Sequence, residues 1–214
     1  MSGSAERRAI ADFLARRRPN ITGNNEGPIL KNNSEFLAEV IQAAANLDSS
    51  YLCIQGPPGA GKTYTAKHII GELLRRGLRV GISSNSHKAI NNLLEGVADH
   101  IKQQGIKASL IKVHSDQTDP IFERGDVEHA GTIKNVSLPR TVCLGGTAWA
   151  FASEAVENEF DYLFIDEAGQ VSIANLIGMS QSTRNIVLMG DQMQLSQPTQ
   201  GVHPGDSGQS ILDY

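Results

Sequence analysis

The chain of 214 residues carries 40% hydrophobic and 20% charged side chains and a formal net charge of −4 at pH 7. This balance is too apolar for a disordered protein and too acidic for one that coats nucleic acid with its whole surface. No apolar run approaches the roughly 18 residues that a membrane-spanning helix needs. Residues 1–18 also lack the apolar core of a secretory signal. We therefore expect a cytoplasmic protein with no membrane partner.

The N-terminal 33 residues predict a helix followed by a linker. Apolar residues recur at helical spacing, namely Ala9, Ile10, Phe13 and Leu14. Pro19 ends this run, and residues 19–33 are rich in Gly, Asn and Pro. A second amphipathic helix should follow, with Ser34 as its N-cap. We place the domain boundary here, with residues 1–33 as helix and linker and residues 34–214 as one lobe.

Short apolar runs then alternate with amphipathic segments. The runs lie at 51–55, 79–83, 109–113, 141–145, 162–166 and 186–190. This alternation predicts an α/β fold, in which a parallel sheet is covered by helices on both faces. The polar stretch at 115–140 is expected to be a loop or a small excursion. Cys53 and Cys143 fall inside apolar runs, which favours reduced core thiols over a disulfide or a metal site.

Residues 56–63 read G-P-P-G-A-G-K-T, which fits the phosphate-loop pattern G-x-x-x-x-G-K-[ST] directly after an apolar run. In such a loop, backbone N–H groups surround phosphate, Lys62 reaches the β and γ phosphates, and the Thr63 hydroxyl holds Mg²⁺. The alternative is a glycine-rich turn before a helix. We predict a site for ATP and Mg²⁺ formed by Gly56, Pro57, Pro58, Gly59, Ala60, Gly61, Lys62, Thr63 and Tyr64.

Two further segments fit this chemistry. The run at 162–166 ends in Asp166 and Glu167, which we expect beside the phosphate loop. Asp166 would hold Mg²⁺ through water, and Glu167 would polarise the attacking water. Gln194 follows the run at 186–190 and could sense the γ-phosphate. We therefore predict an ATP hydrolase with Lys62, Glu167 and Gln194 as catalytic residues, although acids at a strand end are also common as solvated groups.

In this order, segments 56–63, 166–170 (DEAGQ) and 190–198 resemble motifs I, II and III of superfamily 1 helicases. The DEAGQ form resembles the branch that includes the nonsense-decay RNA helicase. Segments 83–88 and 145–149 resemble motifs Ia and Ic. The amino-acid sequences of these segments also resemble the helicase half of bacterial proteins that join a RecB-like nuclease to such a helicase.

This resemblance implies a RecA-like lobe that contacts single-stranded DNA or RNA. The contact residues it implies are Ser84, Asn85, His87, Thr147 and Trp149. The alternatives are that Trp149 is a core residue and that His87 only caps its helix. Motifs IV to VI and any nuclease motif are absent, so the chain resembles a first lobe alone. We expect it to be a monomer. Its partners would be a second RecA-like lobe and a nuclease domain. Because the second lobe supplies the arginine finger, the chain alone should hydrolyse ATP poorly.

Three functions stay open at this point. The first is the ATP-binding lobe of a helicase or translocase that couples hydrolysis to movement on single-stranded nucleic acid. The second is an ATP-dependent nucleic-acid-binding switch without unwinding, and the third is a P-loop NTPase that acts on protein partners. The segments that resemble motifs Ia and Ic favour the first two.

Overall fold

The computed structural model describes residues 8–24, 26–31, 33–191 and 210–212. Within this part of the chain, seven parallel strands form one sheet in the order β1-β7-β6-β2-β5-β3-β4. The strands are β1 Tyr51–Gln55, β2 Arg79–Ser83, β3 Ser109–Val113, β4 Glu128–Ala130, β5 Val142–Gly146, β6 Phe160–Ile165 and β7 Thr183–Gly190.

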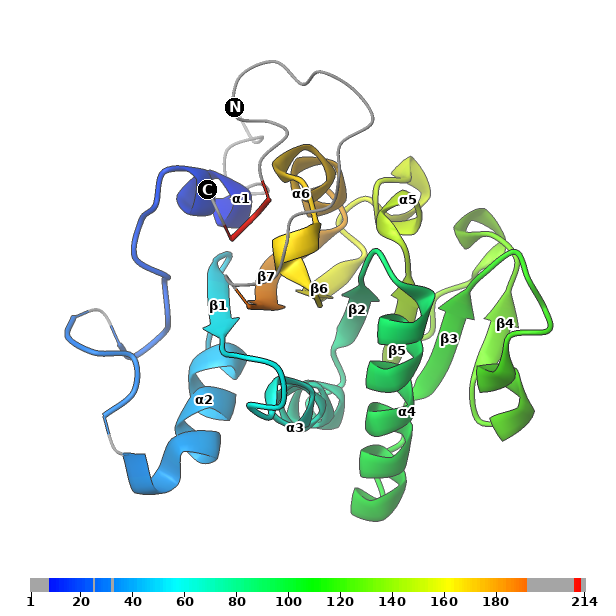
Figure 1. Ribbon diagram of the computed structural model, residues 1–214, viewed down its shortest axis with the longest axis horizontal. Helices are drawn as coiled ribbons and strands as arrows, with labels where there is room; N and C mark the ends of the chain where they lie inside the picture. Colours follow the sequence, from blue (N-terminus) through cyan, green and yellow to red (C-terminus); the bar gives the residue numbers. More distant parts are fainter. Residues whose placement is uncertain (1–7, 25, 32, 192–209, 213–214) are drawn as a thin grey trace.

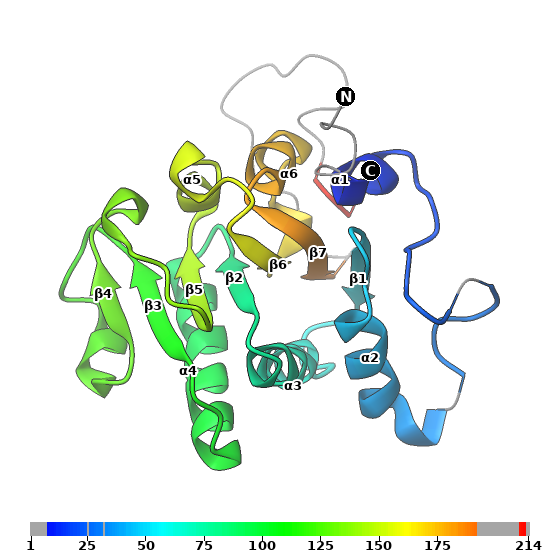
Figure 2. The same cartoon turned by 180° about the vertical axis from the view of Figure 1, so that it is seen from behind.

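Helices cover both faces of this sheet (Figures 1 and 2). One face carries α2 Phe36–Ala45, α3 Lys62–Arg75 and α4 His87–Gln104, and the other carries α1 Arg8–Leu14, α5 Ala148–Phe151 and α6 Ile173–Ser180. Short 3-10 turns lie at Asn33–Glu35, Pro120–Arg124, Ile133–Asn135, Glu154–Val156 and Ala168–Gln170. Each helical layer packs its apolar residues into a separate buried cluster. The predicted α/β fold with a doubly covered parallel sheet is therefore confirmed.

The helix boundaries follow local chemistry in three cases and depart from the sequence prediction in one. Gly105 ends α4 with a φ of 65°, and Gly77 follows α3 with a φ of 79°, because glycine adopts the left-handed backbone without strain. Ser86 caps α4 by accepting a hydrogen bond from the Ala89 N–H at 3.3 Å. The prediction of Ser34 as the cap of α2 was wrong, because a 3-10 turn intervenes and Glu35 occupies the cap position.

The polar stretch 115–140 contains a strand that the sequence reading missed. Strand β4 has three residues, of which Glu128 is exposed and the other two are half-buried, so it carries no apolar run. It pairs in parallel with β3 and extends the sheet at that edge. Cys143 is buried in β5 as predicted, whereas Cys53 is exposed because β1 lies at the opposite edge.

Among the described residues, the loops predicted to carry function emerge from one edge of the sheet. Gln55 pairs with Gly190, Leu188 with Ile165, and Ile165 in turn with Ser83. The carboxyl ends of β1, β7, β6 and β2 therefore lie at one level, which is the usual location of ligand sites in open α/β sheets.

Candidate nucleotide site and nucleic-acid face

The phosphate loop joins the end of β1 to the first turn of α3. Gly59 and Gly61 have φ values of 79° and 82°, a backbone conformation that residues with a side chain rarely adopt. A Cβ on Gly56 would lie 3.1 Å from the Cβ of Ala60, so the turn is also too tight for a larger residue. The Gly56 N–H donates to the carbonyl of Gly190 at 3.2 Å, which fixes the loop to β7.

The groups that this loop presents are donors. Lys62 bends over the loop, and its Nζ donates to the carbonyls of Gly56 at 2.5 Å and Pro57 at 2.9 Å. The Thr63 side chain is exposed, and Tyr64 keeps 54% of its surface exposed. The first N–H groups of a helix have no acceptor within the helix, and the helix dipole places partial positive charge there. An ammonium, a hydroxyl and a helix N-terminus without a carboxylate fit a phosphate group.

Asp166 follows β6, and β7 lies between β6 and β1. One strand therefore separates Asp166 from the strand that leads into the phosphate loop. Burial is the main cause that raises the Asp166 pKa, and the charge of Glu167 adds to it. The Glu167 N–H, which donates to Asp166 Oδ1 at 2.9 Å, and the charge of Lys62 both oppose the rise. Lys62 and Asp166 thus interact across β7, and a divalent cation would favour the ionised carboxylate.

Glu167 lies in an unusual backbone conformation that contacts from β2 support. Its φ is 53°, which is uncommon for a residue other than glycine and clusters at functional sites. The Ser84 hydroxyl donates to Glu167 Oε2 at 3.1 Å. The Asn85 side-chain amide donates to the carbonyl of Gln170, at the end of the turn that follows Glu167. Ser84 is only 2% exposed, a position that suits a link between two loops better than contact with a nucleic-acid strand.

The nucleic-acid residues predicted farther along the sheet edge do meet. A pocket of about 260 Å³ is lined by His87, Thr147 and Trp149, together with His114 and Thr132 from the stretch between β3 and β5. We call it the His87–Trp149 pocket. Trp149 is 86% exposed, which rules out the core alternative. His87 is the first residue of α4, while Ser86 provides the cap, so the capping alternative for His87 was wrong.

A buried ionic network supports this pocket. Lys112 is fully buried in β3, and its Nζ donates to the side chains of Asp119 and Asn91. Asn91 in turn donates to Asp119 Oδ1 at 2.7 Å, and His114 Nδ1 lies 3.3 Å from Asp119 Oδ2. The His87 and His114 rings pack with their centroids 3.8 Å apart. The network thereby reaches a side chain that lines the pocket.

Sequence reasoning missed this network and the two additional lining residues. One signal was present, because Lys112 stands inside an apolar run, and a charge at such a position needs a buried partner. His114 follows directly after β3, which is the same strand-end position that identified Asp166. No pattern in the sequence indicated Thr132.

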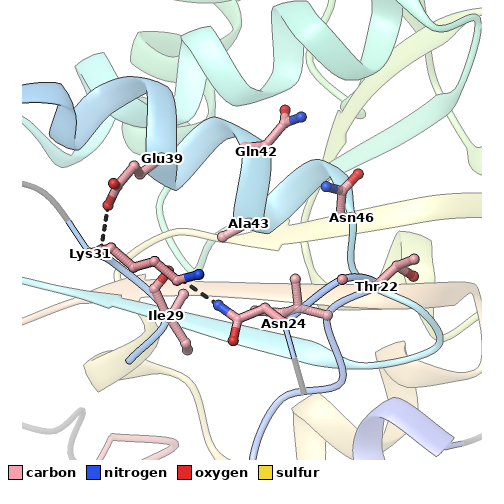
Figure 3. A pocket seen from close by; sticks show the side chains of 10 residues that line it. Thr22, Asn24, Ile29, Lys31, Glu39, Gln42, Ala43 and Asn46 are labelled. Atoms are coloured by element: carbon pink, nitrogen blue, oxygen red, sulfur yellow. Dashed lines mark hydrogen bonds between the residues drawn. The ribbon is translucent and has the colours of Figure 1, made fainter. Parts of the chain in front are cut away.

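Other predicted features lie apart from these sites. Gln194 and residues 192–198 of the predicted motif III lie outside the described residues. Between the N-terminal arm and α2 lies a pocket of about 200 Å³, and Gln42, Asn24 and Asn46 are among the residues that line it (Figure 3). The Lys31 N–H donates to Glu39 Oε2 at 2.6 Å beside it. No residue that lines this pocket belongs to the phosphate loop.

Two absences among the described residues bear on the class of protein. None of the helices in this part of the chain is long and apolar enough to cross a membrane. The same residues contain no group of three or more His, Cys, Asp or Glu side chains placed to hold a metal ion.

Comparison with known proteins agrees with this geometry. Residues 36–207 match the family model described as "AAA domain". The chain is 30% identical over 171 residues to the "DNA replication ATP-dependent helicase/nuclease DNA2" of Saccharomyces cerevisiae, a match that covers 77% of the chain and 11% of that protein. It is 31% identical over 169 residues to the "DNA replication ATP-dependent helicase/nuclease JHS1" of Arabidopsis thaliana, covering 75% and 12%. The chain therefore spans about a tenth of the length of these relatives.

Among solved structures, a nuclease-deletion mutant of the Type ISP restriction-modification enzyme LlaGI, in complex with a DNA substrate mimic, matches with a TM-score of 0.51. The sequence identity is 15%, and the match covers 75% of this chain and 15% of that one. This likeness supports the fold.

Proposed function

We propose that this chain couples ATP hydrolysis to movement on single-stranded nucleic acid. The chain belongs to the AAA domain family, and it is the first RecA-like, ATP-binding lobe of a superfamily 1 helicase. The observation that carries the proposal is the shared sheet edge. The phosphate loop, the Asp166–Glu167 turn and the His87–Trp149 pocket all follow the carboxyl ends of strands, and hydrogen bonds from Ser84 and Asn85 connect the loop of β2 to that of β6.

The family implies a nucleotide together with a divalent metal ion, and the residues fit ATP and Mg²⁺. Lys62 would contact the β and γ phosphates, and Thr63 and Asp166 would hold Mg²⁺, directly or through water. Bound Mg²⁺ would neutralise charge that develops on the phosphates during hydrolysis. Glu167 would accept a proton from the attacking water at its carboxylate.

The His87–Trp149 pocket supports nucleic acid as the partner. Thr147 offers a hydroxyl for a phosphate, and the exposed indole of Trp149 offers a face on which a base can stack. The relatives are named as DNA replication helicase/nucleases, which favours DNA over RNA as the strand. By the same kinship we propose a second RecA-like lobe and a nuclease domain as partners. The cytoplasmic location stays a prediction.

The test uses the full-length protein and single-stranded DNA and RNA oligonucleotides. We expect the oligonucleotide to stimulate ATP hydrolysis, and Lys62→Ala to abolish nucleotide binding in calorimetric titration while the protein stays folded. The double change His87→Ala and Thr147→Ala, which leaves the hydrogen bonds of Ser84 and Asn85 in place, should reduce the stimulation and spare the unstimulated rate. If neither DNA nor RNA stimulated hydrolysis, the protein-directed NTPase would replace this proposal. Stimulation without strand separation or movement would instead favour the binding switch.

A further inference from the structure

Helix α1 ends in a turn that carries three consecutive exposed arginines, Arg16, Arg17 and Arg18. The Arg17 N–H donates to the carbonyl of Asp12 at 2.9 Å, and the Arg16 N–H donates to that of Phe13 at 2.9 Å. This pair of hydrogen bonds defines a Schellman turn, whose left-handed position is usually glycine. Arg16 occupies that position with a φ of 50°. The chain therefore keeps an arginine where a glycine would relieve backbone strain.

The side chains around this turn are held in place. The buried carboxylate of Asp12 accepts hydrogen bonds from Arg17 Nη1 at 3.1 Å and from Arg8 Nε at 3.3 Å. Arg18 Nη2 donates to Asn24 Oδ1 at 3.0 Å. A guanidinium carries five N–H donors, and among the described residues each of these contacts occupies one nitrogen. The groups are thus oriented by the fold and still have donors for a ligand.

A further arginine reaches the same region from the start of β7. Arg184 is exposed, and it donates to Asp48 Oδ1 at 2.5 Å and to the Ser49 hydroxyl at 3.1 Å. Ser49 also has a φ of 50°. Two residues later, the Tyr51 hydroxyl donates to the carbonyl of Arg17 at 2.5 Å. The turn before β1 therefore connects Arg184 to the arginines of the arm.

Together these residues form what we call the arginine surface, namely Arg8, Arg16, Arg17, Arg18 and Arg184. The carboxylates that contact it within the described part of the chain are those of Asp12 and Asp48, so it is basic on a chain whose net charge is −4. Strain gathers here as well. Of the four described residues other than glycine with a positive φ, two lie in this region and a third is Glu167. Such strain clusters at functional sites.

The arginine surface lies away from the predicted nucleic-acid pocket. Arg184 is the second residue of β7 and Tyr51 is the first of β1, so the surface flanks the amino-terminal ends of these strands. The His87–Trp149 pocket follows the carboxyl ends of β3 and β5. No Lys or Arg is among the described residues that line the pocket. Cationic contacts to a strand must therefore come from other parts of the protein.

We infer that the arginine surface is a second contact for nucleic acid and binds its phosphate backbone. The inference rests on the proposed function, in which nucleic acid is the partner. Guanidinium groups pair with phosphate oxygens through parallel N–H donors. Contacts of this kind fix a strand without reading its sequence. The surface thus supplies the phosphate neutralisation that the pocket lacks.

The experiment measures binding of a labelled single-stranded oligonucleotide to the full-length protein by fluorescence anisotropy at several salt concentrations. Arg16→Gly removes a charge and gives the turn the residue that it favours. We expect the salt slope to fall by about 0.7 and the affinity to fall a few-fold, while the thermal midpoint does not fall. A purely structural role for Arg16 predicts the reverse, a lower midpoint at an unchanged slope.

A second variant leaves the contacts of Asp12 in place. Arg18→Gln with Arg184→Gln removes two phosphate contacts and should lower the slope by about 1.4. The corresponding changes to Lys keep both charges and should keep the slope. The matched control is Lys102→Gln with Lys107→Gln, two exposed lysines in and after α4, which should leave the slope unchanged. Unstimulated ATP hydrolysis should match wild type in every variant, because none of these residues belongs to the nucleotide site.

The outcomes separate the inference from its premise. Unchanged salt slopes in both variants, with stimulation of ATP hydrolysis intact, would overturn the inference and leave the proposed function standing. Binding of labelled poly-glutamate that the variants lose, at an unchanged slope for the oligonucleotide, would assign the surface to an acidic protein segment and overturn it as well. If the wild type neither bound the oligonucleotide nor responded to it in ATP hydrolysis, the proposed function would fail, and the inference with it.

Discussion

The two ends of the functional edge are built in different ways. At the β1 end, the phosphate loop is one continuous run of residues whose glycine conformations shape it, and its side chains are exposed apart from the half-buried Lys62. At the β3–β5 end, the His87–Trp149 pocket draws residues from several loops and lies over the buried pair Lys112 and Asp119. A contiguous site can lose its function while the fold survives. An assembled site that depends on a buried charge pair should lose its fold first.

The largest expected effect follows from breaking that pair. Asp119→Asn would leave Lys112 buried without a carboxylate, which we expect to lower the free energy of unfolding by about 3–5 kcal/mol. Denaturant titration of the variant against wild type measures this. The double change Lys112→Met and Asp119→Leu replaces both buried charges with apolar side chains. It should recover most of the lost unfolding free energy, because a buried ion pair contributes little over an apolar pair.

The same pair predicts an acid transition. Burial would raise the Asp119 pKa, but hydrogen bonds from Lys112, the Ile121 N–H and Asn91 outweigh it and hold the pKa at about 2. Since this pKa lies below the ordinary value of 3.8, the stabilisation is complete above about pH 4 and is lost as the pH falls toward 2. Asp116→Asn changes an exposed acid in the same loop and serves as the control. It should not alter the midpoint of denaturant unfolding at neutral pH. Equal stability of Asp119→Asn and wild type would remove the distinction between the two ends.

The nucleotide end should show the opposite behaviour. Glu167→Gln in the full-length protein should lower turnover by about 10² or more, the usual contribution of a general base, and leave ATP binding intact. Its thermal midpoint should stay close to that of wild type, because Glu167 is half-buried and, within the described part of the chain, its carboxylate accepts a hydrogen bond from the Ser84 hydroxyl alone. Steady-state hydrolysis and a melting curve on the same preparation test both parts. A large loss of stability would show that this end, too, depends on its charges for folding.

The contrast also explains which features the sequence predicted. The strands at 51–55, 79–83 and 109–113 have the predicted boundaries, because each is a short, mainly apolar run between polar segments. Strand β4 could not be predicted in this way, since backbone pairing with β3 forms it and only the fold reveals that partner. Gly59 and Gly61 could be assigned to the phosphate loop from their places within the segment 56–63 that fits the phosphate-loop pattern. The contacts of Lys112, Asp119 and Asn91 depend on how α4 and the loop after β3 pack, which no local pattern encodes.

A smaller effect is expected at the exposed side of the pocket. Trp149→Ala should weaken binding of a single-stranded oligonucleotide by about 1–3 kcal/mol, the usual contribution of one base stacked on an aromatic ring. Fluorescence anisotropy of a labelled oligonucleotide measures the affinity. Phe36→Ala is the control, because Phe36 is also an exposed aromatic residue, at 49%, but lies on α2. Unchanged affinity in the Trp149 variant would mean that the strand does not stack there, even if the rest of the pocket binds it.

The smallest effect concerns protons at the same pocket. None of the described residues that line it is Lys or Arg. Each phosphate contact made by such a residue contributes about 0.7 to the salt slope on single strands. Burial lowers the His87 pKa below 6.5, and the charges of His114 and Lys112 lower it further, against the opposing effect of Asp119. His87 is therefore neutral at pH 7.5 and gains a proton only under more acidic conditions, where a nearby phosphate would favour the charged form.

Lowering the pH from 7.5 to 5.5 should thus tighten oligonucleotide binding a few-fold and steepen the salt slope by up to about 0.7. His87→Gln should remove the pH dependence of the affinity and of the salt slope, while the salt slope at pH 7.5 stays the same. The difference between variant and wild type therefore separates the effect of His87 from that of cationic contacts elsewhere in the full-length protein. The same proton acts against folding, because a lowered pKa means that the unfolded chain binds it more tightly. A melting curve at pH 5.5 separates the two effects. Identical slopes at both pH values in wild type would exclude His87 from contact with phosphate.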